Sequence, residues 1–428
     1  RYDMRDPSFH GRSPLGGRKE AIGYLPRAES FRDFATLFRE STMTVRRING
    51  WRLSASAGTL IGVLILSVTG LSECSADAVD EAIDAIRSVG VKAEGHAEAI
   101  PAARELQQLS SEEIPRVLDA ARDVNPIAEN WIRGVVFGIA ERSGPPSIDS
   151  MRKYIEDSSK NDIGRGLAME LIRLQDPQLA RSMIDKYLND PSLALREMAV
   201  EQAIDSAASM KEDDRDGAIA KYREALEAAR HPKQLERIVD ALDKLDQPVT
   251  TADAFSLITK WNAVAPFDNV GGVGFDRAYP PEQEFVADQN VDLGAQYDGK
   301  DGAIGWQSVE GSSDEGIVDL AAAYDKEKGA VSYLYTEFES VEDQPAQVRL
   351  GCINANKIWV NGKEVTSNEV YHSGTMIDQY IAPCRLNKGT NRILLKICQN
   401  EQEQSWAQRW EFQFRVTDPT GKGLVSGQ

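Results

Sequence analysis

The hydrophobic pattern of the chain changes at Gln247-Pro248-Val249, and this change constrains the fold more than any other feature. Before it, apolar residues recur with a helical period, as Val79, Ile83 and Ile86 do at i, i+4 and i+7. After it, polar and apolar residues alternate, as in 331–336, and aromatic and β-branched residues become more frequent. The sequence therefore predicts a multidomain protein that is α-helical first and antiparallel β second.

Residues 77–246 form the predicted helical part. Short breakers interrupt it roughly every 14 to 20 residues over much of its length, a spacing typical of antiparallel helix pairs stacked into an array. The breakers are Asn125-Pro126, Pro145-Pro146, Asp176-Pro177, Asp190-Pro191 and His231-Pro232. Residues 190–200, with Asp-Pro followed by Arg and a small residue, resemble the second-helix motif of HEAT repeats. The alternative is an irregular helical bundle, because amphipathic helices pack in many ways.

Residues 252–418 form the predicted β part, and 419–428 are expected to be a flexible tail. Asn361-Gly362 separates two short alternating segments, 357–360 and 363–365. Asn-Gly at such a position indicates a tight hairpin, because both turn residues need a positive φ. Many short strands joined by turns are typical of a β-sandwich or jelly roll.

The β part also resembles a known module, the galactose-binding-like jelly roll. The resemblance lies in residues 358–365, Asp378, 386–391 and 394–397. The opening segment 261–282 is similar to versions found in secreted proteins of planctomycete-type bacteria, where helical repeats often lie beside the module. The resemblance implies a domain associated with glycoside hydrolases that binds sugar or packs on a neighbouring protein.

A sugar site uses aromatic rings for stacking and polar side chains for hydroxyl groups. The candidates in or near predicted loops are Tyr279, Trp306, Tyr371, Arg385 and Trp406. For each aromatic the alternative is burial in the sandwich core. Trp261, Trp359 and Trp410 lie in predicted strands and are expected to be core residues.

Two further sites are candidates. Asp268, Asn269 and Asp276 lie in and around a glycine-rich segment and could supply oxygen ligands to a structural calcium ion, with ordinary turn chemistry as the alternative. The resembled fold implies neighbouring strands for Cys352 and Cys398, which predicts a disulfide between them. The alternative is that both remain free thiols, together with Cys384. No other cofactor is expected.

Residues 43–76 have the three-part layout of a secretory signal peptide. A basic start after Met43 is followed by the apolar run 57–71 and by Cys74-Ser75-Ala76. This predicts an exported protein that is periplasmic, cell-surface or extracellular, and any membrane contact is expected only through an uncleaved signal segment. We expect translation to begin at Met43 and residues 1–42 to be an extension without ordered structure.

Charge and motifs limit the function. The formal net charge of −18 disfavours nucleic acid as a partner. His96, His231 and His372 are scattered, and the chain lacks a Gly-x-Ser-x-Gly nucleophile elbow. The sequence therefore predicts a non-catalytic binding or scaffold protein whose partners are carbohydrate, protein or both. The alternative is a carbohydrate-active enzyme or an accessory subunit of a polysaccharide-degrading system.

Overall fold

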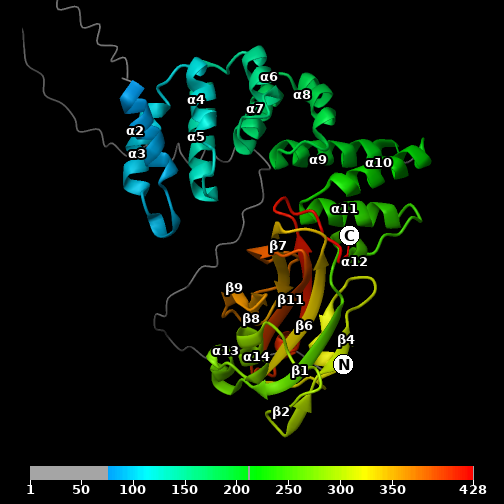
Figure 1. Cartoon of the computed structure of the whole chain (residues 1–428). Coiled ribbons are helices and arrows are strands. Elements are labelled where there is room, and N and C mark those ends of the chain that lie inside the picture. Colours follow the sequence, from blue (N-terminus) through cyan, green and yellow to red (C-terminus); the bar gives the residue numbers. More distant parts are fainter. Residues whose placement is uncertain (1–75, 211–212, 428) are drawn as a thin grey trace, which may run out of the picture. The chain divides into compact units, whose positions relative to one another are not determined.

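Helices come first and antiparallel strands follow in the computed structural model, which describes residues 76–210 and 213–427 (Figure 1). The predicted order, α then β, is confirmed. The predicted extension 1–42 and the signal peptide 43–76, apart from Ala76, lie outside the described residues. None of the described helices combines the length and hydropathy that crossing a membrane requires.

The helices before the first strand contact one another mainly as sequential pairs, such as α2 with α3 and α6 with α7. Their bounds are α2 Ala76–Arg87, α3 His96–Leu106, α4 Ile114–Asp119, α5 Pro126–Ser143, α6 Ile148–Glu156, α7 Asp162–Gln175, α8 Pro177–Ile184, α9 Leu193–Met210, α10 Arg215–Ala228, α11 Pro232–Asp243 and α12 Thr251–Phe255. Short 3-10 turns, η1 Val91–Ala93, η2 Ser111–Glu113 and η3 Asp185–Tyr187, lie between them. The short α12 occupies residues that the sequence pattern assigns to the β part.

Polar side chains at the starts of the second helices tie each pair to an earlier one. The N-cap Asn125 of α5 donates through Nδ2 to Val89 O at 2.7 Å. The N-cap Asn161 of α7 makes the same kind of bond to Leu118 O at 2.9 Å. Each asparagine also accepts backbone N–H groups of its own helix. One residue therefore caps a helix and fixes its neighbour, and of the predicted breakers Asn125-Pro126 supplies such a residue.

The strands form an antiparallel sandwich of two sheets and a separate small hairpin. The strand bounds are β1 Lys260–Asp268, β2 Gln296–Asp298, β3 Ala303–Gly305, β4 Gln307–Glu310, β5 Val318–Asp319, β6 Ala330–Ser340, β7 Gln344–Cys352, β8 Ala355–Val360, β9 Lys363–Asn368, β10 Tyr380–Leu386, β11 Gly389–Gln399 and β12 Glu411–Thr417. The six-stranded sheet has the order β4-β1-β6-β11-β8-β9, the four-stranded sheet β10-β7-β12-β5, and β2 pairs with β3. The predicted Asn361-Gly362 turn joins β8 to β9, and both residues have positive φ, 50° and 79°.

The central strands of the six-stranded sheet, β6 and β11, are largely buried on both faces. The inner face of this sheet meets the four-stranded sheet in an inter-sheet core that includes Trp261, Leu334, Leu395 and Trp410. Its outer face is covered by residues 269–306, between β1 and β4, which contain η4 Val270–Gly272, α13 Val273–Asp276, α14 Pro280–Asp288 and the β2–β3 hairpin. Together they form an outer cluster of Val264, Phe267, Phe275, Tyr279, Phe285, Val291, Tyr297, Val331, Tyr333, Tyr335, Ala355, Trp359, Leu394 and Cys398. We call residues 269–306 the cap.

A buried ion pair anchors the cap on the sheet. Lys396 of β11 is fully buried, and its Nζ donates to Phe275 O at 2.9 Å, Arg277 O at 2.8 Å and Glu282 Oε2 at 2.9 Å. The Tyr333 hydroxyl donates to the same Glu282 oxygen at 2.7 Å. Burial lowers the pKa of Lys396 and raises that of Tyr333. The Lys396 ammonium group thus donates to three oxygen atoms, which offsets the free-energy cost of burying its charge.

The last residues are bound to the sandwich. The N–H of Leu424 donates to Val416 O at 2.9 Å, and Leu424 packs against the inter-sheet core. The N–H of Gly427 donates to Glu339 O, and Ser426 Oγ accepts from the Glu339 N–H. The flexible tail predicted for 419–428 is thus corrected for 419–427, because these residues satisfy open backbone groups of the sheet.

The structure also corrects the predicted disulfide, because Cys352 and Cys398 are both free thiols. β8 and β11 are neighbours as expected, but Cys352 lies in β7, in the four-stranded sheet. Its side chain belongs to the inter-sheet core, whereas Cys398 faces the outer cluster. Burial raises the pKa of each thiol to about 12.

Loss of the anchor should destabilise the protein. Lys396→Met removes the ammonium and leaves the Glu282 carboxylate buried, so the free energy of unfolding should fall by about 3–5 kcal/mol in urea denaturation. The matched control, Lys363→Met, alters an exposed lysine of β9 and should have little effect. The double variant Lys396→Met with Glu282→Leu should recover part of the loss, because no unpaired charge stays buried. A stability of Lys396→Met within about 1 kcal/mol of wild type would contradict the anchor.

Alkylation tests the thiols. In denaturant without reductant, iodoacetamide should label Cys352, Cys384 and Cys398 alike, as read by peptide mass spectrometry. In the folded protein, Cys384 should react before the other two, because it is only partly buried and its pKa is raised less, to about 11. Detection of a Cys352–Cys398 linked peptide would contradict the structure.

Candidate functional site

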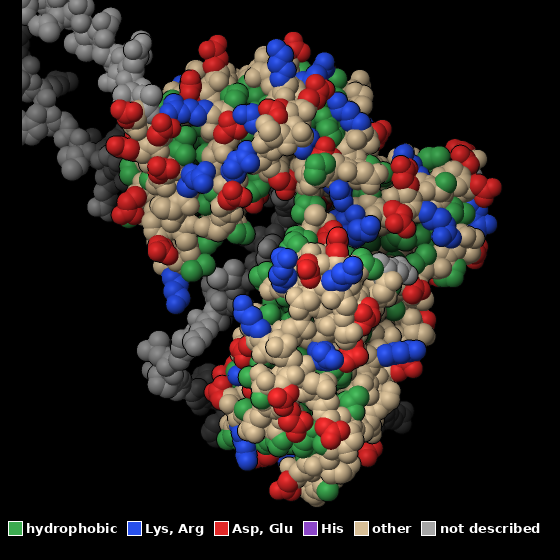
Figure 2. Space-filling view, viewed as in Figure 1, with side chains coloured by type: hydrophobic (Ala, Val, Ile, Leu, Met, Phe, Trp, Pro, Cys, Tyr) green, Lys and Arg blue, Asp and Glu red, His purple; other side chains and the backbone are tan. Residues whose placement is uncertain are grey.

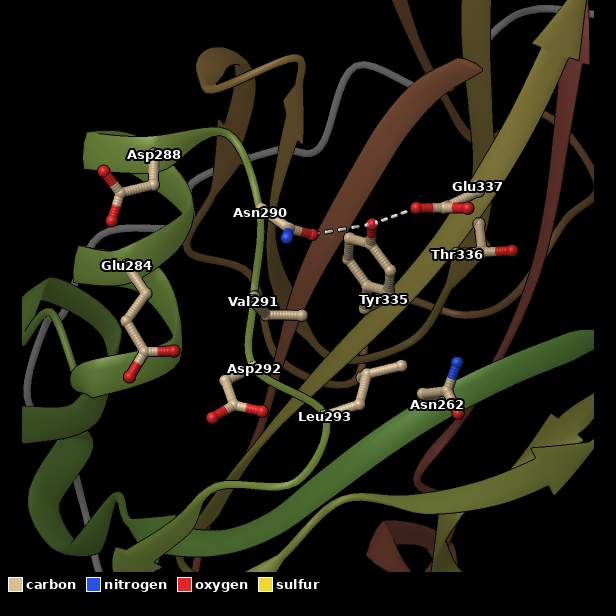
Figure 3. Close-up of a pocket in the computed structure, with 10 residues that line it drawn as sticks. All are labelled: Asn262, Glu284, Asp288, Asn290, Val291, Asp292, Leu293, Tyr335, Thr336 and Glu337. Carbon is tan, nitrogen blue, oxygen red and sulfur yellow. Dashed lines mark hydrogen bonds between the residues drawn. The ribbon is translucent and has the colours of Figure 1, made fainter.

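A hollow of about 770 Å³ lies on the outer side of the six-stranded sheet, where the cap leaves part of it open (Figure 3). The cap contributes one side through α14 and residues 290–293, and β1 and β6 contribute the other. The lining residues are Asn262, Glu284, Asp288, Asn290, Val291, Asp292, Leu293, Tyr335, Thr336 and Glu337. This volume is within the usual range for a small-molecule site.

Local sequence explains how the cap reaches this position. Pro280 and Pro281 begin α14, where the N–H group that proline lacks would have no acceptor within the helix. Gln289 ends the helix with a left-handed φ of 55°. The Gln289 N–H donates to Phe285 O, which closes the last turn. Phe285 is fully buried and meets the Tyr335 ring edge-on, at 6.2 Å between centroids. The chain therefore turns back over β6 and brings residues 290–293 to the rim.

Tyr335 and Glu337 form the β6 side of the hollow. The Tyr335 hydroxyl donates to Glu337 Oε1 at 2.7 Å and lies 3.3 Å from Asn290 Oδ1. Burial, together with this bond to Glu337, raises the pKa of Tyr335. Arg392 Nε, on the neighbouring strand β11, lies 3.4 Å from the same Glu337 oxygen. These contacts fix the Glu337 carboxylate.

The cap side has both fixed and free carboxylates. Glu284 Oε2 accepts from the Tyr297 hydroxyl at 3.0 Å, and burial raises the pKa of Tyr297 to about 12. Asp292 Oδ1 accepts from the N–H of Gly294 at 2.9 Å. The side chain of Asp288, at the end of α14, has no hydrogen bond or ion pair within the described part of the chain. Asp288 is thus the carboxylate most available to a ligand.

The chemistry of the lining is that of an acceptor surface. It has four carboxylates, two amides, two hydroxyls and the apolar Val291 and Leu293, and none of its ten residues is Lys or Arg. Carboxylates accept hydrogen bonds and do not donate them when ionised. A ligand that fits must therefore supply many donors, while an anionic ligand would be repelled.

Three of the predicted sugar-binding residues pack with the outer cluster. Tyr279 is buried, stacks on Phe267 at 4.7 Å and donates to Asp268 O. Trp306 packs against the cluster and donates to the Tyr297 hydroxyl at 3.2 Å. The Tyr371 hydroxyl accepts from Asn269 Nδ2 at 3.1 Å. For these side chains the core alternative describes the structure better than a ligand site.

The other two are exposed but lie on different elements, one in a strand and one in a turn. Arg385 is an exposed residue of β10, opposite Pro345 in the four-stranded sheet. Trp406 lies in the turn Ser405–Ala407 (η5) after β11, where 57% of its surface is exposed. Its ring meets that of His372 edge-on at 5.0 Å. The five candidates thus do not form one site.

The predicted calcium site is not assembled. Asn269 is fully buried, and its Oδ1 accepts from the Gly274 N–H while Nδ2 donates to Tyr371 and to Gln399 O. Asp268 Oδ1 accepts from the N–H of Val270, and Asp276 points to solvent near Lys357. The oxygens serve turns and loop contacts instead. Residues 76–210 and 213–427 contain no cluster of three or more His, Cys, Asp or Glu that could hold a metal.

Sequence reasoning missed the residues of the hollow. They come from β1, α14, the segment 290–293 and β6, which are brought together only when the cap folds onto the sheet. One local signal exists, the clustered acidic residues of 282–292, but acidic residues are frequent throughout this chain.

Comparison with known proteins gives only distant similarities. The sequence matches no protein-family model and no curated protein. Among solved structures, a β-glucosidase from Kluyveromyces marxianus aligns at 13% identity and a TM-score of 0.17, covering 21% of this chain and 11% of that one. The PA14 domain of the MpAFP antifreeze protein aligns at 15% identity and 0.17, covering 22% and 47%. A Ruminococcus gnavus β-glucuronidase aligns at 12% identity and 0.22, covering 38% and 28%. This chain thus spans less than half of each, and TM-scores of this size do not establish a shared fold.

Proposed function

We propose that this protein is an exported, non-catalytic binding protein whose β-sandwich holds a carbohydrate in the hollow between the cap and strands β1 and β6. The proposal depends on one observation, a hollow of about 770 Å³ whose polar lining is dominated by hydrogen-bond acceptors. A neutral or amino-bearing sugar supplies hydroxyl or ammonium donors to such a lining, and Val291 and Leu293 offer it an apolar wall. Uronic acids and sulfated sugars are disfavoured by charge.

A second candidate is hydrolysis of a glycan in the same hollow. Glycoside hydrolysis uses two carboxyl groups that flank the scissile bond, and Glu284, Asp288, Asp292 and Glu337 surround this hollow. Release of reducing sugar from a polysaccharide panel by the full-length protein would favour the enzyme. Binding without release would favour the non-catalytic protein.

The helices are proposed to be a HEAT-like array that presents a surface to a protein partner. The contacts of Asn125 and Asn161 with an earlier helix pair support the array, since they repeat at similar sequence separations, 36 and 43 residues. On the face shown in Figure 2, basic and acidic side chains are interspersed. Such a mixed surface suits a protein partner with its own mixed charges better than it suits a polyanion.

Export predicts a defined mature terminus. If the signal peptide 43–76 is cleaved after Ala76, the protein recovered from its native cell should begin at Asp77 by N-terminal sequencing. Fractionation of the same cells should find the protein outside the cytoplasmic fraction. A recovered protein that still contains residues 43–76 in the cytoplasmic fraction would contradict export.

Ligand binding can be tested at Asp288 and Asp292. We expect a glycan array to identify neutral or amino sugars, and Asp288→Asn with Asp292→Asn to raise the Kd of the best one about ten-fold or more in calorimetry. The loss should follow because charged acceptors form stronger hydrogen bonds than neutral ones. Asp298→Asn, at an exposed position of β2 outside the hollow, is the matched control and should leave the Kd unchanged.

Two results would oppose this assignment. One is a glycan array on which the full-length protein binds none of the glycans. The other is an unchanged Kd in the double variant, which would place the ligand elsewhere on the protein.

A further inference from the structure

Trp406 differs from the other tryptophans that the structure describes. Trp261, Trp359 and Trp410 are buried, and Trp131 and Trp306 pack against core clusters. Trp406 keeps 57% of its surface exposed. Its exposed ring offers an aromatic face to a ligand.

The turn below Trp406 is held rigidly. Ala407 is fully buried, and its carbonyl accepts from Lys328 Nζ at 2.8 Å and from Gln399 Nε2 at 3.3 Å. Gln399 is itself fully buried, and its Oε1 accepts from Asn354 Nδ2 at 2.9 Å. The backbone that carries the indole is therefore held in place before any ligand arrives, which reduces the entropy lost on binding.

His372 braces the indole from the neighbouring loop. The two rings meet edge-on, with an interplanar angle of 86°. Nε2 of His372 lies 3.1 Å from Asn400 Oδ1, whereas its Nδ1 is buried without a hydrogen-bond partner in the described structure. This nitrogen is inaccessible to a ligand, so His372 contributes to the site through the ring contact that orients the indole.

The surroundings favour one class of occupant. Glu401, Gln402, Glu403 and Gln404 precede the turn and are all exposed. Of the basic residues close by, Lys328 donates to the Ala407 carbonyl and Arg409 pairs with Glu411. Acidic side chains disfavour an anionic lipid surface. An exposed indole among carboxylates and amides lacks the wider apolar centre of a protein interface, but it suits the apolar face and hydroxyl edge of a pyranose.

We propose that Trp406 is a stacking surface for a pyranose unit of a neutral polysaccharide, separate from the hollow. The groups around Trp406 have no residue in common with the lining of the hollow. This second contact therefore stands whether or not the hollow binds sugar. If both bind, the sandwich contacts a polysaccharide at two places, which raises its affinity for chains over single sugars.

The test is affinity electrophoresis of the full-length protein in gels that contain xylan, laminarin or galactomannan, with cellulose and chitin pull-down beside it. Trp406→Ala should weaken retention about ten-fold on at least one polysaccharide, and Trp406→Phe should have an intermediate effect. Ile381→Ala removes a similarly exposed apolar side chain from β10 and should bind as wild type. Binding should shift the tryptophan emission of wild type to the blue, and not that of Trp406→Phe.

The outcomes separate the two sites. Unchanged retention of both Trp406 variants, equal losses in Ile381→Ala, or a wild type retained by none of the five polysaccharides overturns the proposal. Loss of a co-purified protein with glycan retention intact assigns the indole to a protein interface and also overturns it. In the same gels, a loss confined to the Asp288→Asn and Asp292→Asn variant supports the hollow and rejects the indole. Melting temperatures equal to wild type confirm that each variant is folded.

Discussion

The buried contact between Lys396 and the cap is the interaction on which the position of the cap, and with it the hollow, depends. An ammonium group inside a protein is tolerated only when oxygens replace its water, and here two carbonyls of residues 275–277 and the Glu282 carboxylate do so. These oxygens come from α13, from the residue after it and from α14. The charge therefore selects one arrangement of the cap on the sheet. The aromatic side chains of the outer cluster contribute most of the apolar burial, which is less specific about arrangement.

The hollow is a consequence of that arrangement. Glu282 points inward to Lys396, while Glu284 and Asp288 of the same helix line the hollow. One helix thus uses one carboxylate to hold the cap and two others to form an acceptor surface. The turn that carries Trp406 is built in a similar way. Buried Asn354 and Gln399 fix its backbone, while the indole stays exposed. At both places, buried polar groups fix the position of exposed ones, which is how binding sites gain preorganisation.

The sequence predicts the parts that depend on local pattern. The two periods separate helices from strands, Asn361-Gly362 locates a hairpin, and the strand tryptophans are core residues as expected. The cap is different, because its loops and short helices have no strong period, and nothing local shows that they cover the outer face of a sheet. Tyr279 and Trp306 therefore resemble exposed loop residues in the sequence but pack in a second core. Asn269 likewise resembles a calcium ligand, but its amide holds a buried loop network.

Features that depend on contacts between residues distant in the sequence could not be predicted either. Cys352 and Cys398 belong to strands of different sheets, and only the sheet order shows that their side chains enter different clusters. The hollow is formed by residues from 262 to 337, so that no short motif contains it. Trp406 could be proposed from sequence as an exposed aromatic, but its exposure depends on the turn that buries Ala407.

Amide hydrogen exchange of wild type and Lys396→Met, followed by mass spectrometry, tests the central role of the anchor most directly. The account predicts faster exchange in residues 273–295 of the variant under native conditions, with the protection of β6 and β7 retained. Such a result would show that the ammonium holds the cap, and with it the hollow, on an intact sandwich. Unchanged protection of 273–295, or an equal loss of protection across both sheets, would contradict it.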